Sequence, residues 1–338
     1  MHATISTDIC IIGAGPVGLF AVFEAGLLKL RCHVVDALPQ VGGQLSEIYP
    51  KKPIYDIPGY PEVLAGDLVQ NLMRQIEPFH PTFTLGERVE SFEKLEDGSF
   101  VLTTTDGTEI RCKAIAIAGG LGSFEPRKPA IEELEKYEGG KGVYYMVRDP
   151  ETFRDQRIVI AGGGDSALDW TIFLANVAKE VTLVHRGTTF RGAADSAEKV
   201  KALHEAGKVN LVLSSNVTHV HGQEQLEAVT ITANDGSTNT ITVDSFIPLF
   251  GLTPKLGPIG EWGLELEDDA VKVNTLDYST SVPGVYAIGD INTYPGKLKL
   301  ILCGFHEAAL MAQGAYKYMY PDKKYVLKYT TVNGVPTL

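Results

Sequence analysis

The sequence contains few cysteines, and none of them lies close to another. Its 338 residues include four, at Cys10, Cys32, Cys112 and Cys303, with no CxxC pair and no spacing typical of a zinc site. Isolated cysteines of this kind are usually small, buried apolar residues of a protein kept in a reducing compartment. The cysteines therefore argue against a disulfide scaffold and favour a cytoplasmic protein.

Positive charge and long apolar runs are also scarce. The chain has 30 lysines and arginines against 42 aspartates and glutamates, a formal net charge of -12. Binding to a phosphate backbone requires a basic surface, so nucleic acid is not an expected partner. No apolar run approaches the roughly 18 residues of a membrane span, and the first residues have no basic region typical of a signal peptide. We expect a globular chain of about two domains without a membrane partner.

A first nucleotide-binding pattern occurs near the start of the chain. Residues 8–13 predict a strand, 14–30 a helix and 31–36 a second strand, which together form a βαβ unit. Gly13, Gly15 and Gly18 form GxGxxG between the first strand and the helix, where backbone N–H groups can approach a pyrophosphate. Asp36 ends the second strand, where an acid can accept hydrogen bonds from a ribose. The alternative is a glycine turn with a structural role only.

The same order of elements then occurs a second time. Residues 119–129 and 280–289 are rich in glycine and proline or lead into a strand, and we interpret them as crossings between domains. Each half contains a strand, a helix, a strand and a β-meander. We predict an α/β fold with two Rossmann-like, three-layer dinucleotide-binding domains. The second, residues 121–281, is inserted into a discontinuous first domain made of 1–120 and 282–338.

The second fingerprint differs from the first in the residues that follow it. Gly162, Gly164 and Ala167 form GxGxxA, but the next strand is followed by Arg186 rather than by an acid, and Arg191 follows in TTFRG. Arginines bind a 2′-phosphate through charge-assisted hydrogen bonds, whereas an acid would repel it. The second site is therefore predicted to prefer NADPH to NADH. Pairing of these arginines with surface carboxylates is the alternative.

These motifs in combination resemble a known group of flavoproteins. GAGPVG, GGQ, GGGDSA and YAIGD occur in the order found in thioredoxin-reductase-like enzymes, which hold FAD in the discontinuous domain and NADPH in the inserted one. Residues 144–149, YYMVRD, lack the dithiol of thioredoxin reductase itself. GGQLSEIYP, YDIPGYP and GDINTYPGKLKLI instead resemble the thioredoxin-reductase-type ferredoxin–NADP(+) reductases, the type 2 family.

The resemblance implies particular cofactor contacts. Tyr49 would stack on one face of the flavin ring and Tyr329 on the other. Val89 would contact the adenine through its backbone. Asp290 would bind the sugar-alcohol chain, near a helix that begins around Leu298. The implied FAD residues are Gly13, Gly15, Pro16, Gly18, Asp36, Gln44, Tyr49, Val89, Phe124, Asp290 and Thr331. The implied NADPH residues are Gly162, Gly164, Asp165, Ser166, Arg186 and Arg191. Gly187 stands where a further arginine is expected, which weakens the preference for NADPH.

The resemblance also implies an activity. A hydride would pass from NADPH to FAD, and single electrons from FAD to a ferredoxin or flavodoxin, with no obligatory protein acid or base. A tail that closes over the flavin of a partner subunit would imply a homodimer. The lysines that could meet an acidic partner are Lys51, Lys52, Lys297, Lys299, Lys323, Lys324 and Lys328; a scatter of solubilising lysines is the alternative. Two rival functions are a thioredoxin-reductase-like reductase with another acceptor and a non-catalytic flavin-binding sensor.

Overall fold

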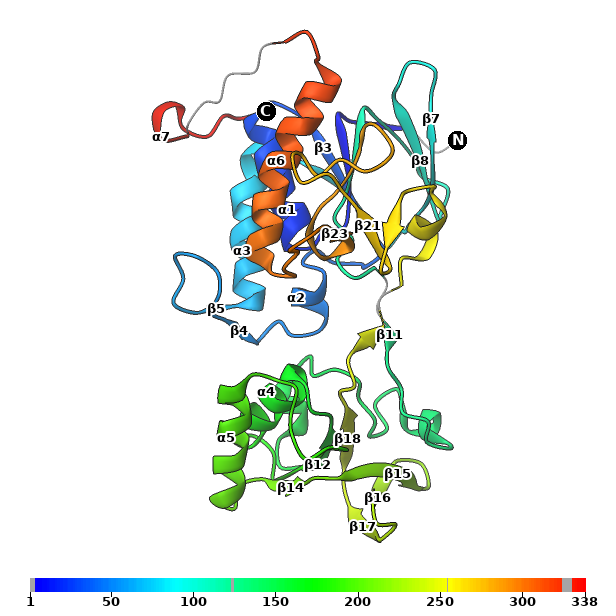
Figure 1. The fold of residues 1–338 in the computed structure, drawn as a ribbon, viewed down its shortest axis with the longest axis vertical. Coiled ribbons are helices and arrows are strands. Elements are labelled where there is room, and N and C mark those ends of the chain that lie inside the picture. Colours follow the sequence, from blue (N-terminus) through cyan, green and yellow to red (C-terminus); the bar gives the residue numbers. More distant parts are fainter. Residues whose placement is uncertain (1–3, 123–124, 254, 324–329) are drawn as a thin grey trace. The chain divides into compact units, whose positions relative to one another are not determined.

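The computed structural model describes residues 4–122, 125–253, 255–323 and 330–338 and contains two compact units (Figure 1). The first unit combines Met1–Phe124 with Pro254–Leu338, and the second is Glu125–Thr253. The chain enters the second unit through β11 (Glu125–Pro126) and leaves it through β19 (Leu252–Thr253), two short strands that pair antiparallel. The second unit is thus an insertion, as predicted.

The end of the insertion was predicted wrongly. The structure places it at 253 and not at 281, so that residues 254–281 belong to the first unit. Ile259, Leu264 and Val271 of this segment are buried in the core of the first unit. Strand β21 (Ala270–Lys272) also pairs with β23 (Asn292–Thr293) of that unit. The glycine- and proline-containing stretch at 280–289 is accordingly a connection within the first unit.

The first unit is built around a five-stranded parallel sheet. Its strand order is β22 (Val285–Ala287), β10 (Ala114–Ile117), β2 (Ile9–Ile12), β3 (Cys32–Asp36) and β6 (Thr82–Leu85). Strand β10, with the sequence AIAI, is buried at all four positions, as expected for a parallel strand covered on both faces. Helices α1 (Pro16–Leu27), α3 (Ala65–Ile76) and α6 (Ile301–Met319) lie side by side on one face (Figure 1).

The other face of this sheet is covered by β-structure, which completes three layers. A second sheet has the order β1 (Ile5–Ser6), β9 (Glu109–Cys112), β8 (Phe100–Thr104) and β7 (Val89–Lys94). Each face of the parallel sheet has its own hydrophobic core, and alternate residues of β2 contribute to each. Ile9 and Ile11 belong to the core on the helix side, and Cys10 belongs to the core on the other side. The buried cysteines Cys10, Cys32 and Cys112 confirm the expectation of apolar roles.

The second unit repeats this arrangement. Its parallel sheet has the order β14 (Asn210–Val212), β13 (Glu180–Val184), β12 (Arg157–Ala161) and β18 (Ser245–Pro248). Helix α4 (Asp165–Leu174) follows β12 as α1 follows β2, and the antiparallel strands β15 (Ser215–Gly222), β16 (Leu226–Ala233) and β17 (Thr238–Thr242) form the meander. Helix α5 (Ala194–Glu205) was not predicted, because Val200 is its one buried residue and its sequence has little apolar periodicity.

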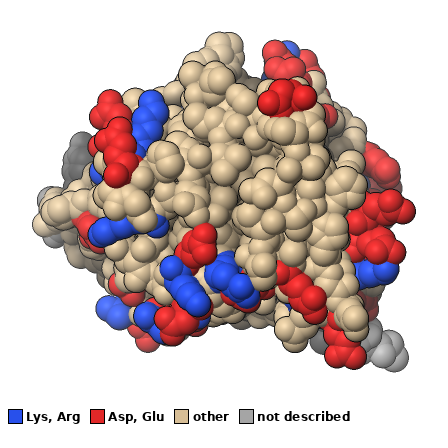
Figure 2. Space-filling model, turned by 90° about the horizontal axis from the view of Figure 1, so that it is seen from below, with Lys and Arg blue, Asp and Glu red and all other residues tan. Residues whose placement is uncertain are grey.

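Several further short elements occur in the described chain. They are α2 (Gln44–Glu47), β4 (Pro53–Ile54), β5 (Val63–Leu64), β20 (Leu266–Glu267) and α7 (Thr330–Asn333). No helix among the described residues is both long and apolar enough to cross a membrane. On the face drawn in Figure 2, lysines and arginines lie among aspartates and glutamates around the edge and across the lower part, and a wide area above these carries neither. Basic and acidic side chains are thus interspersed on this face.

Candidate functional site

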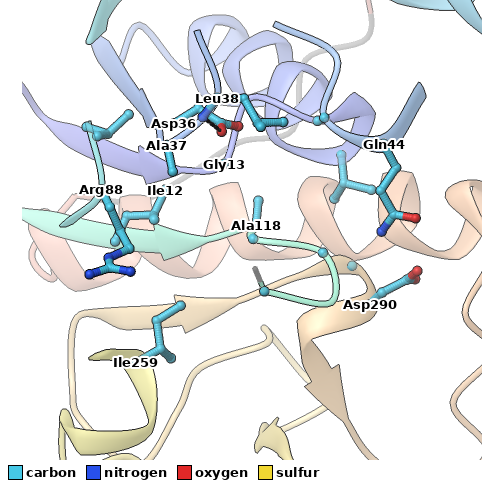
Figure 3. A pocket seen from close by; sticks show the side chains of 18 of the residues that line it. Ile12, Gly13, Asp36, Ala37, Leu38, Gln44, Arg88, Ala118, Ile259 and Asp290 are labelled. Atoms are coloured by element: carbon cyan, nitrogen blue, oxygen red, sulfur yellow. Dashed lines mark hydrogen bonds between the residues drawn. The ribbon is translucent and has the colours of Figure 1, made fainter. Parts of the chain in front are cut away.

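The first unit contains a cavity of about 340 Å³ where the glycine turn after β2 meets the ends of β3 and β10 (Figure 3). Ligands of open parallel sheets bind at these carboxyl ends. The expected FAD residues that line the cavity are Gly13, Gly15, Pro16, Asp36, Gln44, Tyr49, Val89 and Asp290. The structure therefore brings together residues from positions 13 to 290 of the sequence.

The three glycines of the first fingerprint have different surroundings. Gly13 has a φ of +112°, and a Cβ there would lie 2.3 Å from the carbonyl oxygen of Ala118. Gly18 does not line the cavity; a Cβ there would lie 1.9 Å from the carbonyl oxygen of Gly13. At Gly15, a Cβ would meet no atom of the described part of the chain within 4 Å. The first and third glycines thus permit close packing, and the second leaves open space in the cavity.

Asp36 is fixed in place by backbone donors. Its Oδ2 accepts a hydrogen bond from Ala14 N at 2.6 Å, and its Oδ1 accepts one from Leu38 N at 2.8 Å. Burial raises the pKa of the Asp36 carboxyl, and these two hydrogen bonds oppose the rise. A carboxylate has lone pairs for further donors, so Asp36 can still accept hydrogen bonds from a ligand in the cavity.

Gln44 and Asp290 lie on the opposite side of the cavity from Arg88 (Figure 3). A Cβ at Gly120 would lie 3.6 Å from Gln44 Nε2, which shows how closely the loop after β10 approaches this side chain. Burial raises the pKa of the Tyr49 hydroxyl, and the negative charge of Asp290 raises it further. Tyr49, Gln44 and Asp290 thus form one polar end of the cavity.

Among the described residues, Thr331 is a second expected FAD residue, after Gly18, that does not line the cavity. It lies in α7 and is exposed. Phe124 and Tyr329 lie outside the described residues. The cavity also has lining residues that the sequence did not indicate, among them Arg88, Ile259 and Trp262. Arg88 directly precedes Val89 and could have been found from it, whereas Ile259 and Trp262 belong to the segment assigned to the wrong domain.

The loop between Asp290 and α6 departs from expectation. Helix α6 begins at Ile301 and not near Leu298, and Ile301 itself lines the cavity. Lys299 is exposed, but the Lys297 side chain is only 7% exposed and forms an ion pair with the buried Glu307. The suggestion that Lys297 meets an acidic partner is therefore wrong, because its ammonium group faces the interior.

The second fingerprint reproduces the packing of the first. A Cβ at Gly162 would lie 2.6 Å from the carbonyl oxygen of Leu249, which follows β18 as Ala118 follows β10. At Gly164 the sole atom of the described residues within 4 Å of a Cβ would be Nη2 of Arg191, at 3.8 Å. The middle glycine of this turn therefore faces an arginine side chain.

The segment after β13 is held against the start of α4. Arg191 N donates to Gly163 O at 2.8 Å, and Ala193 N donates to Asp165 Oδ1 at 2.7 Å. Arg186 and Ser166 are exposed, Arg186 just beyond the carboxyl end of β13. The structure thus brings Arg191 directly to the glycine turn and leaves Arg186 free to approach a ligand from solvent.

Comparison with known proteins agrees with this fold and with the two fingerprints. Residues 7–308 match the family described as pyridine nucleotide-disulphide oxidoreductase. A ferredoxin–NADP reductase of Flavobacterium johnsoniae is 68% identical over 332 residues, which cover 98% of this chain and 94% of that protein. Ferredoxin–NADP reductase 1 of Christiangramia forsetii is 65% identical over 334 residues, with 98% and 94% covered.

A solved structure gives the same fold. The crystal structure of Lactococcus lactis thioredoxin reductase in its FR conformation aligns with a TM-score of 0.79 at 24% identity, over 93% of this chain and 99% of that one. The predicted fold class is thereby confirmed. The chain belongs to the pyridine nucleotide-disulphide oxidoreductase family and, within it, to the ferredoxin–NADP reductases, which confirms the resemblance found in the sequence.

Proposed function

We propose that the first unit binds FAD, that the inserted unit binds NADPH, and that the chain transfers electrons between NADPH and a ferredoxin or flavodoxin. The observation that carries this proposal is the cavity, which has open space at Gly15, a carboxylate at Asp36 held by backbone donors, and a second carboxylate at Asp290 in its lining. A bound flavin supplies the conversion of a hydride into single electrons. The protein supplies binding, orientation and charge.

The cavity residues suit the parts of an extended dinucleotide. The open space at Gly15 lets backbone N–H groups at the start of α1 approach the pyrophosphate, with Gly13 and Pro16 shaping the turn. Asp36 is positioned to accept hydrogen bonds from the ribose, and Val89 and Arg88 line the cavity on the adenine side. Gln44, Tyr49 and Asp290 line the polar end, where we place the ring and the sugar-alcohol chain.

We place the NADPH pyrophosphate at the start of α4. Gly162, Gly164, Asp165 and Ser166 form the turn, and Arg191 lies at Gly164. Arg186 and Arg191 then supply the positive charge that a 2′-phosphate requires. The hydrogen bonds that join residues 191 and 193 to the turn position this arginine before the nucleotide arrives.

The acceptor is a one-electron carrier and not a protein disulfide. Residues 144–149 offer no dithiol through which electrons could leave. Lys51 and Lys323 are exposed in the first unit and support the approach of an acidic carrier; Lys324 and Lys328 lie outside the described residues. We further propose a homodimer in which the C-terminal tail, with Tyr329, covers a flavin. The buried free cysteines support a cytoplasmic location.

The experiment that tests this proposal is the absorption spectrum of the purified protein, titrated anaerobically with NADPH and then with NADH. We expect one FAD per chain, bleached by NADPH at concentrations where NADH has little effect. A colourless protein that does not take up added FAD would contradict the proposal. A flavin that neither nucleotide reduces would instead favour the flavin-binding sensor.

A further inference from the structure

A buried ion pair lies beneath the turn that carries Asp290. Lys297 precedes α6, Glu307 lies in the second turn of α6, and their side chains are 7% and 0% exposed. A buried ion pair adds little net stability relative to apolar residues, because the cost of removing both charges from water offsets their attraction. Stability alone is therefore a poor explanation for this pair, and its hydrogen bonds indicate another role.

Both members of the pair hold Gly289, the residue before Asp290. Glu307 Oε2 accepts a hydrogen bond from Gly289 N at 2.6 Å, and Lys297 Nζ donates one to Gly289 O at 2.9 Å. The N–H and the carbonyl of Gly289 are thus both fixed by side chains. Gly289 and Asp290 line the cavity, so the backbone that these bonds fix is the wall of the cavity itself.

The carboxylate of Glu307 also holds the chain beyond Asp290. Its Oε2 accepts a second hydrogen bond from Asn292 Nδ2 at 2.8 Å, and its Oε1 accepts one from the Tyr294 hydroxyl at 2.9 Å in addition to the bond from Lys297. Asp290 therefore stands between two residues that donate to the same carboxylate. This network leaves the Asp290 backbone little freedom.

The charge of Lys297 acts on the same carboxyl group. Burial raises the pKa of Asp290, the charges of Lys297 and Lys299 oppose that rise, and Glu307 adds to it. Lys299 is exposed, whereas Lys297 is buried and its charge is screened less by solvent and salt. Lys297 is thus the fixed positive charge at this end of the cavity.

We propose that Lys297 is a positioning residue of the flavin site: anchored by Glu307, it fixes the direction in which Asp290 enters the cavity and keeps a positive charge behind it. The inference rests on the proposed function, since it assumes that the cavity holds FAD. It goes further in assigning a role to a lysine and a glutamate that do not line the cavity.

The test measures FAD binding to the apoprotein and the midpoint potential of the bound flavin in Lys297→Met. We expect the dissociation constant of FAD to rise about tenfold, the effect of losing one charge-assisted hydrogen bond. The potential should become more negative, because the charge that stabilises reduced flavin is gone. Lys299→Met is the matched control: it removes a neighbouring but exposed lysine and should change the dissociation constant by less than about twofold.

Two further variants separate positioning from folding. If Lys297→Met does not fold because Glu307 is left unpaired, the affinity for FAD is measured in the double variant Lys297→Met/Glu307→Gln, which removes both charges. In an Asp290→Asn background, the Lys297 replacement should no longer weaken FAD binding, because its effect acts through Asp290. An unchanged dissociation constant and potential, or an equal loss with and without Asp290, would overturn the inference. Wild-type protein that binds no FAD would instead refute the proposed function.

Discussion

Replacement of Gly15 by alanine separates binding from folding. Gly15 has φ −71° and ψ 178°, extended values that any residue adopts, and a Cβ would meet none of the described residues' atoms within 4 Å. Alanine also restricts the unfolded chain, so the free energy of unfolding should stay unchanged or rise by up to about 1 kcal/mol. The new methyl group would nevertheless occupy the space that the proposed pyrophosphate needs.

The expected loss of binding follows from overpacking a close contact. An extra methyl group in a filled site costs about 1 to 3 kcal/mol, so the dissociation constant of FAD should rise roughly 5-fold to 150-fold. The assay is a fluorescence titration of apoprotein with FAD, together with urea unfolding of the apoprotein. Gly18→Ala is the matched control. Its Cβ would lie 1.9 Å from the carbonyl oxygen of Gly13, so this variant should lower the free energy of unfolding of the apoprotein, which Gly15→Ala should not. A Gly15→Ala protein that binds FAD as tightly as wild type would refute the placement of the pyrophosphate.

Three further predictions address other parts of the molecule. Replacing Arg186 and Arg191 by alanine should raise KM for NADPH far more than KM for NADH, with kcat little changed; equal increases for the two nucleotides in steady-state assays would show that neither arginine contacts the 2′-phosphate. Burial lowers the pKa of His33 from its ordinary value of 6.5 to about 4, and the charge of Glu87 opposes the change. As the pH falls, His33 therefore takes up a proton in the unfolded chain before it does so in the folded one. The contribution of His33 to the free energy of unfolding is fully present above pH 6.5 and falls by about 3 kcal/mol as the pH is lowered toward 4. Urea unfolding of wild type and His33→Gln across this range tests it, and the variant should lack this part of the pH dependence; parallel curves would contradict the assignment. Deleting residues from 328 onward should leave FAD bound but change the rate at which NADPH reduces it in stopped-flow measurements, and identical rates would exclude a role for the tail at the flavin.

The sequence predicted the parts of the fold that depend on local patterns. Both glycine turns, the strands before them and the acid at Asp36 follow from spacing, because a tight strand-to-helix turn requires glycine at fixed positions. Helix α5 was missed because a helix with one buried residue has little apolar periodicity. The boundary at 253 was missed because Ile259 and Leu264 pack against a sheet far away in the sequence.

The site was predictable to a similar degree and for similar reasons. Eight of the expected FAD residues line one cavity. Five of them, Gly13, Gly15, Pro16, Asp36 and Asp290, lie at or just after the carboxyl ends of parallel strands, which meet at one edge of the sheet. The burial of Lys297 could not be predicted, because lysines are normally exposed and its partner, Glu307, is an acid in a helix with no distinctive neighbours. Charge partners that depend on tertiary packing leave no pattern in the sequence.

Electron transfer to a ferredoxin is the central claim, and reduction of cytochrome c by NADPH, with and without added ferredoxin, tests it most directly. The protein should transfer electrons slowly to cytochrome c by itself, and the rate should rise and saturate with ferredoxin concentration. The rise should weaken at high salt, because complementary charge guides the encounter. A rate that ferredoxin and flavodoxin both leave unchanged, in a protein that NADPH reduces readily, would contradict the account and indicate another acceptor.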